Sequence, residues 1–244
     1  MMRRIGVGML LAVGAVVALP LNGGRIAAAV SGSPSPRSSA PAPKFSNPKA
    51  ITNKYLPLAS LKMDVLEGTE KGKTLRVERS VKEGSKTFMI GGQEVQALVM
   101  EDREFLSGEL EEVTLDYFAQ SDEGSVYYLG EDVDNYKHGK VVAHEGAWLY
   151  GKDTKVPGVI MPAKPVVGLK FASESVPKIT HEKDEIISTS ETVTVPAGTY
   201  TNCVKVRETN SDGETEFKYY APGVGVIVEA VGKEKITLKS HETR

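Results

Sequence analysis

The sequence predicts a mainly β protein: a strongly curved antiparallel sheet or half-barrel built as a meander, with little helix. Three observations lead to this prediction. Short runs of alternating apolar and polar residues recur after residue 45 at spacings of about 8 to 12 residues. Glycine-containing turn sequences separate these runs, and almost no stretch repeats apolar residues at helical spacing. A sheet of many strands must curl, close or double over to bury a face, so a two-sheet sandwich and a closed barrel are the alternatives.

Residues 195–229 show the alternation most clearly. The run VKVR at 204–207 alternates apolar and charged side chains, which is the period of a half-buried strand. NSDG at 210–213 ends in Asp-Gly, which supplies the positive backbone angles that a tight hairpin requires. A second alternating run follows, and APG at 221–223 then reverses the chain before a third. The sequence therefore predicts three consecutive strands here.

The same reasoning places the other strands and turns. The expected strands are residues 74–81, 95–105, 110–119, 125–130, 186–195 and 235–240. Glycine turns are expected at 67–69, 83–85, 91–92, 107–108, 122–124 and 231–233. Residues 45–61 form an irregular lead-in, in which Tyr55, Leu56 and Leu58 are expected to dock on the sheet.

The amino-terminal residues have the form of an export signal. Arg3 and Arg4 precede an uncharged apolar run, and small residues before Val30 offer a cleavage site, so residues 1–29 are interpreted as a signal peptide. Residues 30–44 are rich in proline and serine and predict a disordered stalk, which leaves 45–244 as a single β domain. We expect an extracytoplasmic protein, secreted or periplasmic, with no stable transmembrane anchor after processing.

Charge and cysteine content narrow the classes of function. The whole chain carries 30 basic and 32 acidic residues; loss of residues 1–29 removes three arginines and no acid, which leaves 27 against 32, or −5. Such a chain lacks the basic footprint of a nucleic-acid partner. The single cysteine, Cys203, cannot form an internal disulfide. It has the parity of the charged Lys205 and Arg207, which predicts an accessible thiol.

A polar stretch at 131–145 interrupts the regular alternation and could supply ligands to a divalent metal ion. Its candidate ligands are Glu131, Asp132, Asp134, His138, His144 and Glu145. A calcium EF-hand counted from Asp132 would need glycine at Lys137 and an acid at Ala143, so that motif fails. The zinc-protease motif fails as well, because no second histidine follows His144-Glu145 at the required spacing. A metal-binding module, and otherwise a solvated acidic loop, are the two interpretations of this stretch.

Carboxylate pairs suited to hydrolysis could also be drawn from Glu101, Asp102, Glu104, Asp116, Glu131 and Asp132. No Gly-x-Ser-x-Gly sequence occurs, and no nucleophile and base are apparent, so no catalytic residue is assigned. An extracytoplasmic hydrolase acting on glycans or esters is therefore an alternative function without a defined site.

A second irregular segment, residues 156–167, is apolar but interrupted by prolines, so it cannot be a central strand. We expect it to cross the mouth of the sheet as a lid or plug. Adjacent aromatic residues in strands point to opposite faces, so one of each pair is free to hold a ligand. The candidate ligand-binding residues are Val159, Ile160 and Met161 in the lid, and Tyr128, Trp148 and Tyr220 as ring surfaces.

Four strings give the chain a resemblance to a known group: VYYLGEDV (126–133), GVIMPAKPVVG (158–168), TVPAGTY (194–200) and KYYAPGVGVI (218–227). They resemble an uncharacterised family of bacterial exported proteins, which is loosely similar to lipoprotein-carrier-like domains. The resemblance implies a curved antiparallel sheet with an apolar hollow, and no catalytic residues. Together with the residues above, it leads us to expect a binding or cell-envelope accessory protein whose partner is a small amphipathic ligand or an envelope component. No cofactor is expected unless the metal alternative holds.

Overall fold

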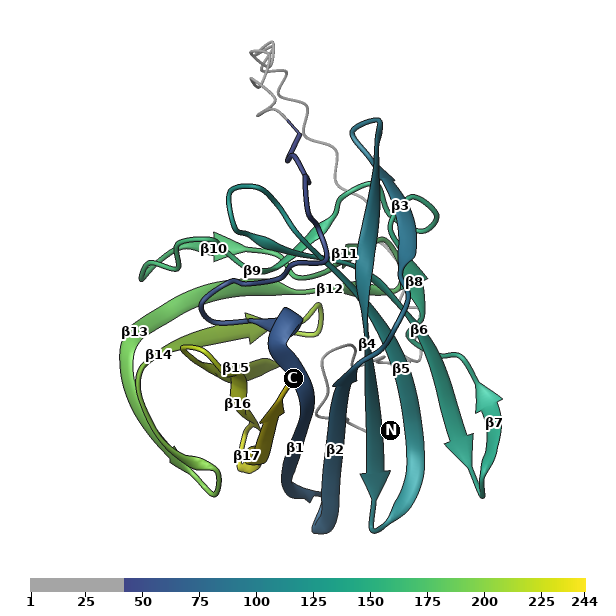
Figure 1. Cartoon of the computed structure of the whole chain (residues 1–244). Helices are drawn as coiled ribbons and strands as arrows, with labels where there is room; N and C mark the ends of the chain where they lie inside the picture. The colour runs from purple at the N-terminus through teal and green to yellow at the C-terminus, as the bar shows by residue number, and fades with distance from the viewer. Residues whose placement is uncertain (1–41) are drawn as a thin grey trace, which may run out of the picture.

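The protein is described here by a computed structural model, which covers residues 42–244. The expected signal peptide, and the expected stalk up to residue 41, lie outside this range. Fifteen strands of the described chain form one antiparallel sheet that curves into an open half-barrel and does not close on itself (Figure 1). The predicted fold class is confirmed, and the regular structure of residues 42–244 contains no α-helix, only the 3₁₀ turn η1 (Leu58–Ser60).

The sheet follows the path β10-β13-β14-β15-β16-β17-β1-β2-β4-β5-β6-β7, with β3 paired to β4, and β8 and β9 paired to β6. The strands of its first half are β1 (Leu61–Glu70), β2 (Lys73–Val81), β3 (Lys86–Ile90), β4 (Gln93–Leu106), β5 (Glu109–Gln120), β6 (Val126–Lys137), β7 (Lys140–Ala143), β8 (Trp148–Leu149) and β9 (Gly158–Met161). The strands of its second half are β10 (Lys170–Phe171), β13 (Lys183–Val195), β14 (Gly198–Thr209), β15 (Thr215–Ala221), β16 (Gly225–Val231) and β17 (Glu234–Thr243). β11 (Ser175–Val176) and β12 (Thr180–His181) form a separate small sheet.

The path is a meander in two halves that meet in the middle of the sheet. β17, the last strand, pairs with β1, the first, in a register that runs from Leu61 opposite Thr243 to Gly68 opposite Ile236. Most other neighbours are consecutive along the chain, as the short turns predict. Among residues 42–244, no helix is long and apolar enough to span a membrane.

The main core fills the concave side of the half-barrel. Strand side chains such as Leu66, Val77, Val206 and Leu238 point into it, and the lead-in adds Leu56. A smaller second cluster includes Phe45, Phe88, Val95, Tyr117 and Leu129. On β4 and β5, residues of the second cluster alternate with residues of the main core, so the two clusters lie on opposite faces of these strands. Both faces are therefore buried where the second cluster covers the sheet.

Three local expectations are wrong, each for a physical reason. Residues 67–69 lie inside β1, and the chain turns at Lys71-Gly72. Position 68 requires glycine because the Cβ atom of any other residue would lie 1.9 Å from the Lys235 carbonyl oxygen of β17. Residues 131–145 are largely the β6–β7 hairpin, which turns at 138–139, and not an irregular loop.

Cys203 is the third correction: its side chain is fully buried in the main core. The pairing of β13 with β14 shifts register on both sides of Cys203, and the preceding Asn202 has a φ of 55°. A bulge of this kind inserts a residue and reverses the face that the following residues occupy. The accessible thiol predicted from strict alternation is therefore absent.

Substitution of Gly158 by alanine is expected to lower stability by about 1 to 3 kcal/mol, the usual cost of overpacking. A methyl group at this position would lie 1.7 Å from the Ser173 carbonyl oxygen, so β9 and the chain beside it must separate. Chemical denaturation measures the loss. Gly168→Ala is the control, because Gly168 has open space around it and tests only its φ of 87°. Equal losses in the two variants would contradict a close backbone approach at Gly158.

Candidate functional site

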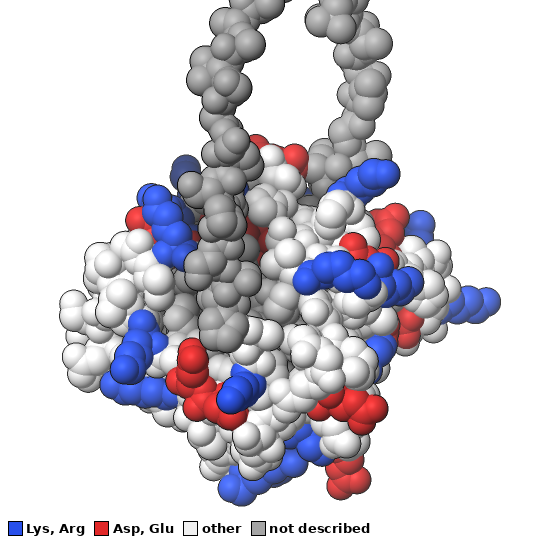
Figure 2. Space-filling view, turned by 90° about the horizontal axis from the view of Figure 1, so that it is seen from above, with Lys and Arg blue, Asp and Glu red and all other residues white. Residues whose placement is uncertain are grey.

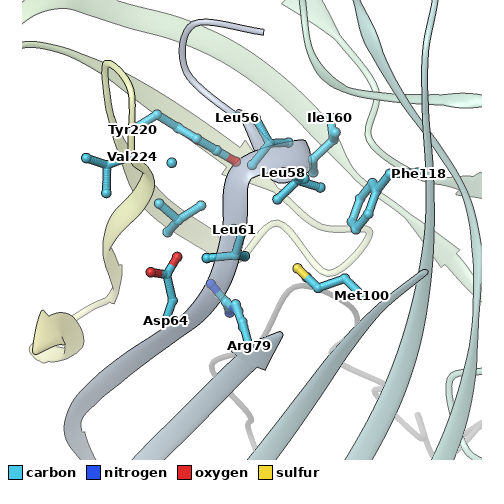
Figure 3. A pocket seen from close by; sticks show the side chains of 12 residues that line it. Leu56, Leu58, Leu61, Asp64, Arg79, Met100, Phe118, Ile160, Tyr220 and Val224 are labelled. Carbon is cyan, nitrogen blue, oxygen red and sulfur yellow. The ribbon is translucent and has the colours of Figure 1, made fainter. Parts of the chain in front are cut away.

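A small apolar hollow lies in the concave side of the half-barrel. Figure 3 shows side chains from the lead-in, from β1, β2, β4, β5 and β9, and from the β15–β16 turn converging on it. Its lining residues are Leu56, Leu58, Leu61, Asp64, Arg79, Met100, Phe118, Ile160, Tyr220, Val224, Gly225 and Val226. The lining is mostly aliphatic and aromatic, and its only charged members are Asp64 and Arg79.

The lead-in borders the hollow because polar contacts fix its path across the sheet. The side chain of Gln120 accepts hydrogen bonds from the backbone N–H groups of Thr52 (2.9 Å) and Asn53 (2.8 Å). Asn53 in turn donates to the carbonyl of Gly124 at 2.9 Å. The Gly223 N–H donates to the Lys54 carbonyl at 2.7 Å, which ties the lead-in to the β15–β16 turn. Leu56 and Leu58 are therefore held in place.

Arg79 is the central charged group beside the hollow and is 4% exposed. Its Nε donates to Asp102 Oδ2 at 2.6 Å, and its Nη1 donates to Glu229 Oε1 at 2.8 Å. Asp102 lies directly opposite Arg79 on the neighbouring strand β4. Glu229 is on β16, which is separated from β2 by β17 and β1. Burial tends to raise the pKa of Glu229, but the positive charges of Arg79 and Lys218 hold this pKa below its ordinary value.

A second ion pair continues the same row of the sheet. Asp64 lies opposite Arg79 on one side and opposite His241 on the other. His241 Nδ1 is 2.6 Å from Asp64 Oδ1, and this hydrogen bond raises the pKa of the histidine despite its partial burial. His241, Asp64, Arg79 and Asp102 thus place alternating charges across four neighbouring strands.

Carboxyl groups that are not paired with a basic side chain lie farther along the same inner face. Asp116 on β5 is directly opposite Glu131 on β6. Tyr128 donates a hydrogen bond to Asp116 Oδ1 at 2.6 Å, and the Tyr128 ring stacks on Phe118 with ring centroids 5.0 Å apart. Burial, reinforced by the neighbouring carboxylates, raises the pKa values of Asp116 and Glu131 well above the ordinary range. Burial also raises the pKa of Glu174 to about 7.

A third group surrounds Lys218, which donates to Glu208 Oε2 at 2.8 Å. Asp184, Glu208 and Glu216 lie directly opposite one another on β13, β14 and β15. Like charges in this arrangement repel. Burial raises the pKa of Asp184 to about 8, with Glu208 adding to the effect. Burial opposes the charge of Lys218, but the surrounding acids keep its pKa well above the ordinary value.

The structure places the six predicted ligand-binding residues in different surroundings. Ile160 and Tyr220 line the hollow. Tyr128 and Trp148 are packed together in the core with ring centroids 5.3 Å apart, so neither offers an exposed ring surface. Met161 is fully buried, and Val159 is partly exposed on β9. β9 is a short strand between two prolines that pairs with β6, and Figure 1 shows it at the upper end of the half-barrel.

The six predicted metal ligands do not come together. Glu131 points into the half-barrel, whereas Asp132 accepts hydrogen bonds from Lys86 and Tyr117. Asp134 pairs with His144 at 2.9 Å, His138 occupies the hairpin turn, and the Glu145 N–H donates to Asn135. Within residues 42–244, no group of three or more histidine, cysteine or carboxylate side chains is arranged to hold a metal ion.

Sequence reasoning selected Glu131 as a metal ligand, but it did not select the basic residues inside the half-barrel, Arg79 and Lys218. A signal was available: Arg79 continues the apolar parity of Leu75 and Val77, and Lys218 has the parity of the buried Tyr220. A charged residue at an apolar position of a strand indicates a buried pair. Figure 2 shows that basic and acidic side chains are also scattered around the edge of the upper face.

The fold and the hollow define an open half-barrel with a partly apolar, partly ionic interior. Comparisons with protein-family models, with curated proteins and with solved structures find no match for this chain. The resemblance to lipoprotein-carrier-like domains stays a prediction.

Proposed function

We propose that this protein is an exported binding protein that holds a small amphipathic molecule in the apolar hollow of its half-barrel. The observation that supports the proposal most directly is the hollow itself. Its lining is apolar with a few polar groups, which is the composition of small-molecule sites. Leu58, Leu61, Met100, Phe118 and Ile160 would contact the apolar part of the ligand.

The position of the charged groups supports an amphipathic ligand over a purely apolar one. In Figure 3 the Asp64 carboxylate and the Arg79 guanidinium lie beyond Leu61, on the side of the hollow away from Leu56 and Ile160. A ligand with one apolar and one polar end matches this division. Its apolar end contributes about 25 cal/mol for each Å² removed from water, and its polar end fixes the orientation.

The test is a titration with the neutral fluorescent probe N-phenyl-1-naphthylamine. We expect a saturable rise in fluorescence that Val224→Phe weakens at least about tenfold, because Val224 lines the hollow and a larger ring would fill part of it. Val142→Phe is the matched control, since Val142 is 61% exposed on β7, outside the hollow. A flat titration, or equal weakening by both variants, would contradict the proposal. Unchanged melting temperatures would show that both variants are folded.

A further inference from the structure

Residues 172–182 form a strap that lies at the upper end of the half-barrel but does not belong to its sheet (Figure 1). The strap contains β11 and β12, which pair only with each other within the described chain. Two hydrogen bonds join its backbone to neighbouring segments. The Val159 N–H donates to the Ala172 carbonyl at 2.8 Å, and Thr154 Oγ1 donates to the Ser175 carbonyl at 2.8 Å. Because strand pairing does not hold the strap on the main sheet, its position depends on side chains.

Three buried carboxyl groups lie where the strap meets the half-barrel. Glu174 and Glu182 belong to the strap and are 1% and 7% exposed, and Asp184 follows it on β13 and is 4% exposed. The Ser173 N–H donates to Asp184 Oδ2 at 2.8 Å, and Ser173 Oγ donates to Glu182 Oε2 at 3.1 Å. Glu174 Oε2 is buried without a hydrogen-bond partner. The contact between the strap and the interior is therefore largely a contact of acids.

The groups that face these three acids offer them little positive charge. Lys218 interacts with all three, but it already forms an ion pair with Glu208 at 2.8 Å. Glu208 also faces all three, and it lies directly opposite Asp184 on β14. The other titratable groups that face them are carboxyl and phenol groups of β5, β6 and β15: Asp116, Tyr128, Glu131 and Tyr220. Ionisation of the three acids would therefore place like charges side by side in a buried space.

These surroundings make the three acids hold their protons more tightly than acids in water. Burial raises the pKa of Glu174 to about 7 and that of Asp184 to about 8. Burial, with the neighbouring carboxylates adding to it, also raises the pKa of Glu182 well above its ordinary value. An open strap would hydrate the three groups and return their pKa values toward about 4. The docked strap thus binds more protons than the open strap, so a rise in pH through about 7 to 8 favours opening.

We propose that residues 172–182 are a pH-controlled strap, which is docked on the half-barrel in acidic solution and released in mildly alkaline solution while the main sheet stays folded. In the docked state its carboxyl groups are neutral beside the ion pair of Lys218 and Glu208. Once they ionise, water reaches them only if the strap moves away, because a buried unpaired charge is costly.

Release of the strap uncovers part of the interior. Trp148, the one tryptophan of the chain, adjoins Glu174 and is 1% exposed while the strap is docked. Opening therefore gives solvent access to the Trp148 ring. The hollow of the proposed function is lined by residues outside 172–182, so the two proposals are independent.

Hydrogen–deuterium exchange at about pH 6 and about pH 8.5 tests the proposal, with each rate compared with that of the unfolded chain at the same pH. We expect the protection of amides in residues 172–182 to fall at least about tenfold between these pH values, as the titration of even one of the acids implies. Amides of β4 and β5 should keep their protection. An unchanged strap would overturn the proposal. An equal loss of protection in β4 and β5 would also overturn it, because the whole fold would then be opening.

The double variant Glu174→Gln/Asp184→Asn tests whether the carboxyl groups release the strap. Both changes keep the shape of the side chain and remove a titrating group, so the strap should stay protected at about pH 8.5. Glu185→Gln is the matched control, because Glu185 is next to Asp184 on β13 but pairs with Arg207. The control should release its strap as the wild type does. Protection of β4 and β5 shows that each variant is folded.

Acrylamide quenching of Trp148 fluorescence is a second measurement of the same opening. Quenching should increase with pH in the wild type and in Glu185→Gln, and it should stay low in the double variant. A double variant whose strap amides or Trp148 ring become accessible with rising pH, as in the wild type, would overturn the proposal.

Discussion

Arg79→Met is expected to lower the free energy of unfolding by about 3 to 5 kcal/mol, the usual result of removing one partner from a buried ion pair. The methionine fills most of the space of the arginine stem, so lost packing contributes little. The loss comes from Asp102 and Glu229, which would remain buried without their shared positive charge. Urea denaturation at neutral pH measures it.

Arg76→Met is the matched control for this substitution. Arg76 is on the same strand and also contacts two acids, Glu67 and Glu78, but its side chain is 39% exposed. Solvent screens these pairs, so the expected loss is below about 1 kcal/mol. Protonation of Asp102 and Glu229 should partly rescue Arg79→Met at acidic pH. Similar losses of unfolding free energy for the two variants would show that the buried ion pairs of Arg79 stabilise the fold no more than the exposed pairs of Arg76.

Stability is expected to fall as pH rises from about 5 to about 8.5. The pKa of Glu174 is raised to about 7 and that of Asp184 to about 8, both by burial. Between their unfolded and folded pKa values, the folded protein binds more protons than the unfolded chain, so each step up in pH favours unfolding. His241 has the same sign, because its raised pKa makes its stabilising charge disappear as pH increases. Melting temperatures at constant ionic strength measure the trend.

Glu174→Gln identifies one source of this pH dependence. It replaces a buried carboxyl by an amide that does not titrate, and a shift of this size corresponds to a free energy on the order of 3 kcal/mol. The variant should be the more stable protein at high pH, and its melting temperature should vary less with pH. Glu109→Gln, at an exposed position of β5, should leave the slope unchanged. A flat wild-type profile would contradict the raised pKa values.

Alternation predicted most of the long strands because it depends only on local sequence. It misplaced a turn at Gly68 and an exposed thiol at Cys203, since both depend on partners: the carbonyl of Lys235 in one case and a bulge opposite β13 in the other. A period of two divides a strand into faces but does not show which face is inside when both carry polar residues. The inward position of Lys218 beside Tyr220 was therefore not predicted.

Most of the residues that line the hollow could not be predicted from the sequence. Of its lining residues, only Ile160 and Tyr220 were selected as ligand contacts, and Leu56 and Leu58 only as docking residues. Leu58, Met100 and Val226 come together because a long sheet curves until distant strands face each other. The curvature is the sum of many strand twists and bulges, and no single stretch of sequence determines it.

The pairing of β17 with β1 sets an order for folding. These strands occupy the middle of the sheet, so neither half can be joined to the other until residues 234–243 are available to residues 61–70. Contacts this distant in sequence form slowly, because the loop between them must close first. A chain that emerges amino terminus first from a ribosome therefore cannot join the two halves until residues 234–243 have appeared. Loss of residues 234–243 would divide the sheet at its centre, not shorten it at an edge.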